Sequence, residues 1–408
     1  MRAQGLSKQN RLLLLVAIAS FALAMFGRAG AQGVPPGPTG IYLNEPMNGE
    51  AAIVALGGRL PEVAALNNRG AADLSSLLRS DSTLWVSPSG ILFYREPTVP
   101  AGAPEVSYGP FSYSQTFFLH SKPGASKVIY LDFDGFTLPA TTAWSGMANM
   151  NVGGYNTSGD ASFTNAEQDV IQSVWQRVAE DYAAFDVDVT TEDPGDAAIT
   201  RSGSGDTVFG TRALITSDAA AWSAACGQGC GGVAYVGTFD QTSNHANYQP
   251  AFVFASGVPG GKSIAEAVSH EVGHNLGLSH DGVVAQNGQA AQGYYTGCLP
   301  PSTNSCAGIW APIMGVGYYK PISQWSKGEY TSANNTEDDI NVIQSNGLAV
   351  RADDHGDSTG AATSLGGTGT LSTSGIITTA ADVDFFAFTA GAGALQASPS
   401  PTAPRPPP

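Results

Sequence analysis

The sequence has little positive charge. Of its 408 residues, 18 are Lys or Arg and 34 are Asp or Glu, which gives a formal net charge of -16 at pH 7. A surface of this sign repels nucleic acid and anionic membrane surfaces, so we expect neither as a partner. Apolar residues are not scarce: they make up 42% of the chain, which is enough to bury a sizeable core.

Long apolar runs are also scarce. The run "LLLLVAIASFALAMF", residues 12–26, follows three basic residues and precedes "AGA" at 29–31. It has the length of a signal-peptide core, whereas a membrane span takes about 20 apolar residues, and no later stretch reaches that length. The pattern predicts a signal peptide over residues 1–31, bacterial-type export, and an extracellular protein without a membrane anchor. We expect this protein to be a monomer.

Cysteine is rare and is absent from the first half of the chain. The four cysteines are Cys226, Cys230, Cys298 and Cys306. Because exported proteins are oxidised, we expect two disulfides; three pairings are open, and the local pairs 226–230 and 298–306 are favoured. A zinc site is the alternative, but the CxxxC spacing is loose and no second matching pair lies nearby.

Strands and long helices follow one another from Lys127 onward. Thr164 and Glu167 form a capping box at the start of an amphipathic helix over residues 164–182. Strands are expected at residues 127–135, 186–194, 212–217, 231–239 and 250–256. A strand, a long helix and then several strands predict an α/β fold with a mixed sheet.

Two further helices are expected. One has Ser263 as its N-cap, Glu266 as the partner in a capping box, and ends at Gly277. The other is weaker, is capped by Thr336, and stops near Gly347.

Three of the six histidines lie in "HEVGHNLGLSHDG", residues 270–282. His270 and His274 are four residues apart, so on a helix they lie about 40° apart and one turn above each other, and both can reach one ion. His280 would face away if the helix continued, but a break at Gly277 lets it fold back as a third ligand. Three imidazoles leave the fourth tetrahedral position of Zn²⁺ to water, which is typical of a catalytic site.

Glu271 lies about 100° around the helix from His270, so it points at the zinc-activated water and not at the metal. This position suits a general base that takes the proton of the water and returns it to the leaving amine during amide hydrolysis. Two alternatives remain: the histidines are ordinary core or surface residues, or the zinc site binds without catalysis.

The complete pattern HExxHxxGxxH resembles the signature of the metzincin metallopeptidases. Asp281 directly after His280 resembles the reprolysin, or adamalysin-like, branch in particular. The resemblance implies one catalytic zinc ion and a twisted mixed sheet with an active-site helix and a smaller C-terminal subdomain. It also implies that Met314, in "APIMGVGYY", forms the methionine turn beneath the zinc. Ile313 stands where reprolysins usually have a cysteine, so their disulfide pattern is not carried over.

The resemblance also implies a substrate-binding strand upstream of the active-site helix. Its backbone would pair with an extended substrate. The residues concerned are Gly232, Val233, Ala234, Tyr235, Val236 and Gly237. Tyr318 and Tyr319 follow the expected methionine turn, and either would stabilise an oxyanion or line the pocket as an ordinary wall residue.

The flanking segments gain a meaning from this resemblance. Residues 32–118 are expected to be a propeptide-like segment of a zymogen, and residues 119–350 the catalytic domain. The segment has no cysteine, which excludes latency by a zinc-bound thiolate and leaves a carboxylate such as Asp81. Residues 351–395 resemble the opening of the bacterial pre-peptidase C-terminal domain, a β-sandwich found on secreted peptidases. Residues 396–408 are expected to be a disordered Pro-rich tail.

The sequence therefore predicts a secreted zinc-dependent endopeptidase that hydrolyses peptide bonds in extended protein or peptide substrates. The alternative is a non-catalytic zinc-containing adhesin or peptide-binding module, and a zinc exopeptidase would need a cleft closed at one end. Calcium is a further candidate ion at two acidic pairs, but acids at a strand end or a helix start more often cap or face solvent. These pairs are Asp132 with Asp134 and Asp338 with Asp339.

Overall fold

The computed structural model describes residues 40–99, 109–286, 288–299, 306–367 and 369–389. The signal peptide predicted over residues 1–31 and the tail predicted over 396–408 lie outside these ranges. Within the ranges, no helix combines the length and the apolar character that crossing a membrane requires.

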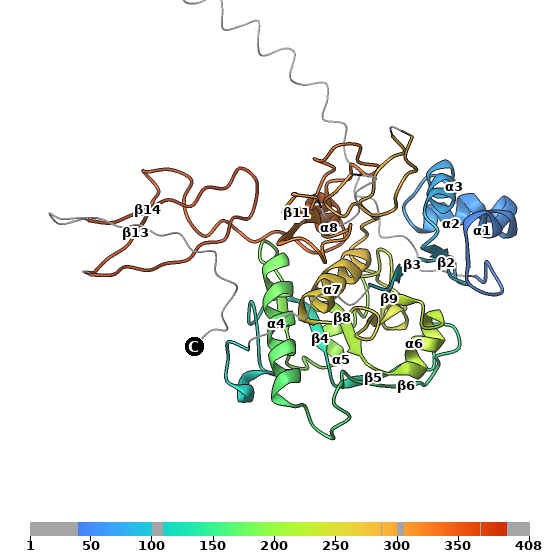
Figure 1. Ribbon diagram of the computed structural model, residues 1–408, viewed down its shortest axis with the longest axis horizontal. Coiled ribbons are helices and arrows are strands. Elements are labelled where there is room, and N and C mark those ends of the chain that lie inside the picture. The colour runs from blue at the N-terminus through green and yellow to red at the C-terminus, as the bar shows by residue number, and fades with distance from the viewer. Residues whose placement is uncertain (1–39, 100–108, 287, 300–305, 368, 390–408) are drawn as a thin grey trace, which may run out of the picture. The chain divides into compact units, whose positions relative to one another are not determined.

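An eight-stranded mixed sheet organises the described residues (Figure 1), with the order β1-β2-β3-β9-β10-β8-β4-β7. Its strands are β1 Met47–Asn48, β2 Leu84–Val86, β3 Leu92–Pro97, β4 Lys127–Asp132, β7 Asp188–Thr190, β8 Phe209–Thr216, β9 Cys230–Tyr235 and β10 Ala251–Phe254. From β10 to β7 neighbouring strands are parallel, whereas β9 is antiparallel to both β10 and β3. All five strands expected from the sequence are present, and the expected α/β fold with a mixed sheet is confirmed.

Helices α4 (Asn165–Asp181) and α7 (Gly261–Asn275) lie next to each other over one face of the sheet (Figure 1). The expected capping box is present, since Thr164 Oγ1 accepts from the Glu167 amide and Glu167 Oε2 accepts from the Thr164 amide. Side chains such as Trp175 and Val272 are fully buried in the core between these helices and the sheet. Burying each such side chain stabilises the fold by about 1.5–3 kcal/mol.

A second core fills the opposite face of the sheet. Trp144, Tyr235, Phe252 and Phe254 pack there, together with the short helix α6 (Ala219–Cys226). The disulfide 226–230 joins the end of α6 to the start of β9, and the second disulfide joins residues 298 and 306. Both disulfides have the predicted local pairing. The remaining short elements here are β5 Gly135–Thr137, β6 Asn151–Gly153, α5 Asp196–Ile199, and the 3-10 helices Tyr113–Gln115 and His245–Tyr248.

Residues 40–99 contain more helix than the sequence indicated. These residues form α1 (Gly49–Leu56), α2 (Leu60–Leu66) and α3 (Ala71–Ser80), besides a 3-10 turn at Gly57–Arg59. Each helix is too short to show a clear period, and helices of this length depend on tertiary packing for stability. They pack on β2 and β3 around a core of their own, which Val236 joins from the end of β9.

The caps of two helices differ from the prediction. The N-cap of α7 is Gly260 and not Ser263, because the Ile264 amide already donates to the Gly260 carbonyl and places Ser263 inside the helix. Glu266 is therefore no capping-box partner. Its carboxylate accepts from Ser323 Oγ at 2.8 Å. Helix α8 (Asp339–Ser345) is capped by Asp338, whose carboxylate accepts from an amide of the first turn, and Thr336 lies before the helix.

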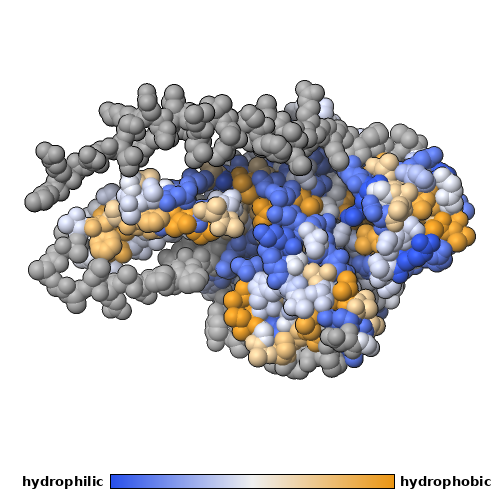
Figure 2. Space-filling view, turned by 90° about the horizontal axis from the view of Figure 1, so that it is seen from above, coloured by the Kyte–Doolittle hydropathy of each residue, from blue (hydrophilic) through white to orange (hydrophobic). Residues whose placement is uncertain are grey.

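The described residues after Arg351, 352–367 and 369–389, form little regular structure. Thr363–Ser364 (β13) and Phe386–Ala387 (β14) make one short parallel pair. Figure 2 shows apolar residues on the surface of this stretch, where Ile377, Val383 and Phe388 are exposed. The β-sandwich over residues 351–395 stays a prediction. Two further short strands pair before this stretch, β11 (Trp310–Pro312) and β12 (Ile322–Gln324).

Candidate metal centre and active site

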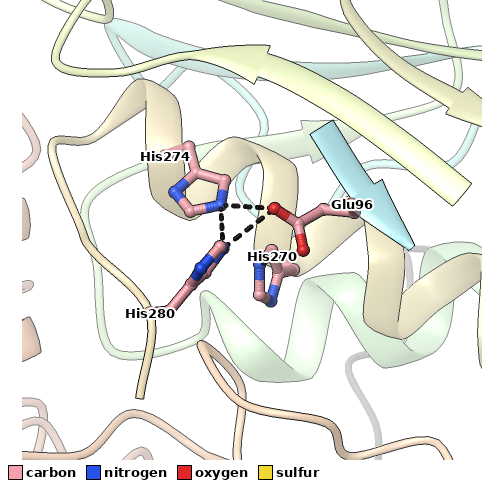
Figure 3. A group of neighbouring side chains, drawn as sticks. All are labelled: Glu96, His270, His274 and His280. Atoms are coloured by element: carbon pink, nitrogen blue, oxygen red, sulfur yellow. Dashed lines mark hydrogen bonds and ion pairs between the residues drawn. The ribbon is translucent and has the colours of Figure 1, made fainter. Parts of the chain in front are cut away.

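The structure brings three histidines of the HExxH stretch together at the end of α7 (Figure 3). His270 and His274 project from successive turns of the helix, and their ring centroids are 4.7 Å apart. The chain then reverses at Gly277, whose φ is +94°, a conformation that glycine adopts at little steric cost. His280 consequently folds back, and its ring centroid lies 4.9 Å from that of His274. All three side chains are buried.

Backbone carbonyls orient the two helical imidazoles. His270 Nδ1 donates to the Ile313 carbonyl at 2.8 Å, and His274 Nδ1 donates to the Leu278 carbonyl at 2.9 Å. A carbonyl can only accept, so each ring carries a proton on Nδ1, and in the neutral ring Nε2 is left free to face the centre of the cluster. This is the tautomer that a metal-binding histidine needs. Burial lowers the pKa of His274 to about 4, which keeps this ring neutral.

A carboxylate orients the third imidazole. Asp81 Oδ2 lies 2.7 Å from His280 Nδ1, so the outer nitrogen of this ring also has an acceptor. Burial lowers the pKa of His280, but the negative charges of Glu96 and Asp81 outweigh it and raise the pKa to about 10. The same negative charge favours a metal cation at the cluster. Asp81, which the sequence offered as a cap on the metal, therefore lies behind a ligand and not at the metal position.

Glu96, on β3, is the fourth member of the cluster (Figure 3). Its Oε1 lies 2.8 Å from His280 Nε2 and 3.4 Å from His274 Nε2, and its Oε2 lies 3.6 Å from His270 Nε2. The Nε2 atoms of His274 and His280 are 3.2 Å apart. Ligands of a tetrahedral zinc ion with bonds near 2.0–2.1 Å lie about 3.3 Å from one another. The four residues therefore fit a zinc ion bound between them.

Sequence reasoning missed Glu96. It occupies an alternating position in the strand "LFYREP", and no spacing or motif distinguishes it from the other acids of the first hundred residues. Only the pairing of β3 with β9 places it at the histidines.

Glu271 lies fully buried beside the cluster. Neither of its carboxylate oxygens has a hydrogen-bond partner among the described residues. Burial, and then the charge of Glu96, raise its pKa well above the usual range. The carboxylate lies directly against β9, where a Cβ added to Gly232 would come within 2.0 Å of Glu271 Oε1. A buried carboxylate without a partner, beside the three histidines, can accept and return a proton.

Met314 lies behind the metal-binding helix. It is fully buried, in a turn where the Gly315 amide donates to the Pro312 carbonyl at 3.1 Å. Its Sδ packs on α7, and a Cβ added to Gly273 would come within 2.6 Å of that sulfur. Met314 thus packs against the helix that carries His270 and His274, and its role as a methionine turn stays a prediction.

The two tyrosines proposed as oxyanion or pocket residues differ in their surroundings. Burial raises the pKa of Tyr318 well above its usual range, and the charges of Glu96 and Glu271 add to this effect. Burial also raises the pKa of Tyr319, but no charged residue of the site contributes to that rise. Of the two tyrosines, Tyr318 is therefore the one whose pKa is affected by the carboxylates of the site.

Tyr294 is a second residue that the sequence did not reveal. Its hydroxyl donates to Glu96 Oε2 and lies 3.2 Å from Thr83 Oγ1. Its ring centroid lies 4.4 Å from that of His280. "GYYTG" around this residue carries no pattern that separates a site tyrosine from a surface one.

The strand expected to bind substrate is β9, and its outer edge is occupied by β3 of the same chain. The pairs Phe93–Tyr235, Tyr94–Ala234 and Arg95–Val233 are antiparallel. The last two residues of the expected set lie beyond the strand: the Val236 amide donates to the Leu92 carbonyl, and the Gly237 amide donates to the His274 carbonyl.

The acids considered for calcium have structural partners. Asp132 is buried in an ion pair with Arg212 and accepts from the Asp134 amide at 3.0 Å. Asp338 caps α8, and Asp339 accepts from the Ser326 amide at 2.8 Å. These contacts account for the carboxylates of Asp132, Asp338 and Asp339 without an ion, whereas Asp134 takes part through its backbone amide.

Comparison with known families gives one match. Residues 206–326 match the family model for metallo-peptidase family M12. The matched stretch contains strands β8 to β10, helix α7, the three histidines and Met314. No curated protein and no solved structure matches the chain. The match supports a zinc-dependent metallopeptidase that acts on protein or peptide substrates.

Proposed function

We propose that this protein is a secreted zinc endopeptidase that hydrolyses peptide bonds in extended protein substrates. One observation carries the proposal: three imidazole Nε2 atoms, each with its Nδ1 held by an acceptor, converge beside the unpartnered carboxylate of Glu271. The two disulfides agree with an oxidising compartment outside the cell.

His270, His274 and His280 would hold the zinc ion. When bound, zinc supplies a Lewis acid that activates water and polarises the scissile carbonyl. Glu271 takes the proton of the attacking water and delivers it to the nitrogen of the leaving amine. The carbonyls of Leu278, three residues past the end of α7, and of Ile313, next to Met314, keep the ring orientations fixed during these transfers.

The β9 backbone would hold the substrate. An extended peptide added to the outer edge of β9 would pair with it through main-chain hydrogen bonds, which gives affinity without a strict sequence requirement. Gly232 brings this strand against Glu271, so the peptide bond beside it would lie next to the base. Binding along a strand does not depend on a chain terminus, which favours an endopeptidase over an exopeptidase.

The test is hydrolysis of a quenched random-peptide library by the wild-type chain and by Glu271→Gln, each as purified and after limited proteolysis. Loss of the general base should lower turnover by about 10²–10⁴-fold, with one zinc bound per chain in both proteins. Glu180→Gln, an exposed acid on α4, is the matched control and should behave as wild type.

Equal turnover in wild type and Glu271→Gln would reject the general base. Turnover absent from all of the proteins, with zinc bound and the fold intact, would favour the zinc-containing peptide-binding module instead.

A further inference from the structure

We propose that the segment of residues 81–97 is a built-in inhibitor, in which β3 takes the place of substrate along β9 and Glu96 is the fourth ligand of the zinc ion. This inference rests on the proposed function, since it concerns the same site. Glu96 would supply a carboxylate in place of the thiolate, which a segment without cysteine cannot provide.

The strand pairing aims Glu96 at the histidines. Between the pairs Arg95–Val233 and Pro97–Cys230 the register shifts, so β3 has one residue, Glu96, where β9 has Gly231 and Gly232. Irregularities of this kind re-aim a side chain at a chosen point of a sheet. Here the irregularity lies at Gly232, the residue of β9 that also lies against Glu271. The inhibitory carboxylate and the general base therefore meet at the same place on β9.

Tyr94 closes the site next to Glu96. Residues two apart in a strand share a face, so Tyr94 and Glu96 both point toward α7. The Tyr94 ring stacks on His274 with centroids 4.3 Å apart and lies 4.1 Å from the His280 ring. Its side chain is fully buried. A substrate therefore has no access to the imidazoles while β3 is in place.

Glu96 has the surroundings of a ligand and not those of a chance contact. Only 5% of the residue is exposed, and a carboxylate buried to that extent is costly unless it is paired or binds a metal. Oε1 faces the Nε2 atoms of His274 and His280, and Oε2 accepts from the Tyr294 hydroxyl. Both oxygens are thus engaged at the cluster, and the hydroxyl fixes the side chain in this orientation.

The N-terminal part of the chain also holds the loop that carries the third histidine. Asp81 accepts from His280 Nδ1, and Arg69 Nη2 donates to Ser279 Oγ at 2.7 Å. Two residues that precede β3 in the chain therefore contact this loop. Coordination by Glu96 makes and breaks no covalent bond, so the inhibition is reversed when β3 leaves β9.

The test uses the purified full chain with Co²⁺ in place of zinc, because cobalt reports its ligands by visible absorption. Acetohydroxamate is titrated into wild type, Glu96→Gln and the control Glu45→Gln, an exposed acid that lies before the segment of residues 81–97. If the closed state exceeds about nine-tenths of the wild-type molecules, opening should raise the apparent hydroxamate affinity by about tenfold or more. We expect this rise in Glu96→Gln together with a changed cobalt spectrum, and neither change in Glu45→Gln.

Peptide hydrolysis is measured on the same three proteins loaded with zinc and should rise by a similar factor in Glu96→Gln. An unchanged spectrum and an unchanged hydroxamate affinity in a folded Glu96→Gln chain would overturn the proposal. If Glu96→Gln does not fold, Glu96→Asp keeps the charge and withdraws the carboxylate by one methylene, and the same two readouts decide.

The two proposals fail in different ways. If Glu96→Gln binds hydroxamate more tightly but cleaves no peptide, the proposed inhibition by Glu96 is supported and the proposed endopeptidase activity is rejected. The wild-type full chain could instead bind hydroxamate and cleave peptides as well as Glu96→Gln. That result would support the proposed endopeptidase activity and reject the proposed inhibition by Glu96.

Discussion

Glu96 Oε1 and His280 Nε2 lie 2.8 Å apart, although 184 residues separate them in the sequence. The contact joins the strand that precedes the peptidase-like region to the last histidine of its motif. Because His280 is itself placed by the reversal at Gly277, a glycine and a distant strand together decide what surrounds the metal position.

Gly232→Ala should damage the site. The added Cβ would come within 2.0 Å of Glu271 Oε1, so either Glu271 or β9 must move. We expect a loss of about 1–3 kcal/mol in the free energy of unfolding, measured with urea, and a large fall in peptide hydrolysis. Gly203→Ala, which meets no atom within 4 Å, serves as the control. Unaltered stability and turnover in Gly232→Ala would contradict the packing of Glu271 on β9.

Met314→Ala should destabilise the fold beneath the histidines. The side chain is fully buried, and removing it leaves a cavity behind α7 that costs about 2–5 kcal/mol. Met314→Leu conserves the volume and should cost less than about 1.5 kcal/mol. Urea unfolding of the two variants measures the difference. Equal losses would show that the sulfur itself, and not the filled volume, matters at this position.

Asp81→Asn should weaken metal binding by the full chain. The carboxylate orients His280 through Nδ1, and removing such an outer partner typically lowers metal affinity by about 10–100-fold. Competition with a chromogenic chelator measures the zinc affinity. Asp73→Asn, an exposed acid on α3, is the control. An affinity that stays at the wild-type value would mean that Asp81 contributes nothing to ligand orientation.

His120 should stabilise the protein in a pH-dependent way. Its ring lies between Asp188 and Glu192, at 2.6 and 2.8 Å. The hydrogen bond to Asp188 is the main cause that raises the pKa of His120 to about 9, against the opposing effect of burial. Because the pKa is raised on folding, the stabilisation is complete below pH 6.5 and is lost as the pH rises through 9.

His120→Gln tests this dependence. Urea unfolding at intervals between pH 6 and 10 should show a loss of about 1–3 kcal/mol at the acidic end that disappears at the alkaline end. A difference from wild type that is constant over this range would show that the imidazole contributes packing and no charge.

The parts of the site that the sequence predicted are those that depend on local geometry. His270 and His274 share a helix face because four residues make one turn, and Gly277 marks the break that returns His280. The two disulfides close short loops of neighbouring residues. The strands and α4 were recognisable because their apolar positions recur with a regular period.

The parts that the sequence did not predict depend on pairing between distant segments. Glu96 reaches the histidines only through the pairing of β3 with β9, which no local pattern encodes. Ser263 had the chemistry of an N-cap, but Gly260 begins the helix three residues earlier. The three helices of residues 40–99 are too short for a period and form against one another and the sheet.

The pairing of β3 with β9 also bears on how the chain folds without aggregating. Without β3, the described part of β9 would present a row of unpaired amides and carbonyls at the boundary of a long sheet, and such edges recruit strands from other molecules. The segment that carries β3 is made first and remains attached while the sheet forms. With β3 paired to β9, that boundary is covered while the chain folds, which disfavours edge-to-edge pairing with another copy.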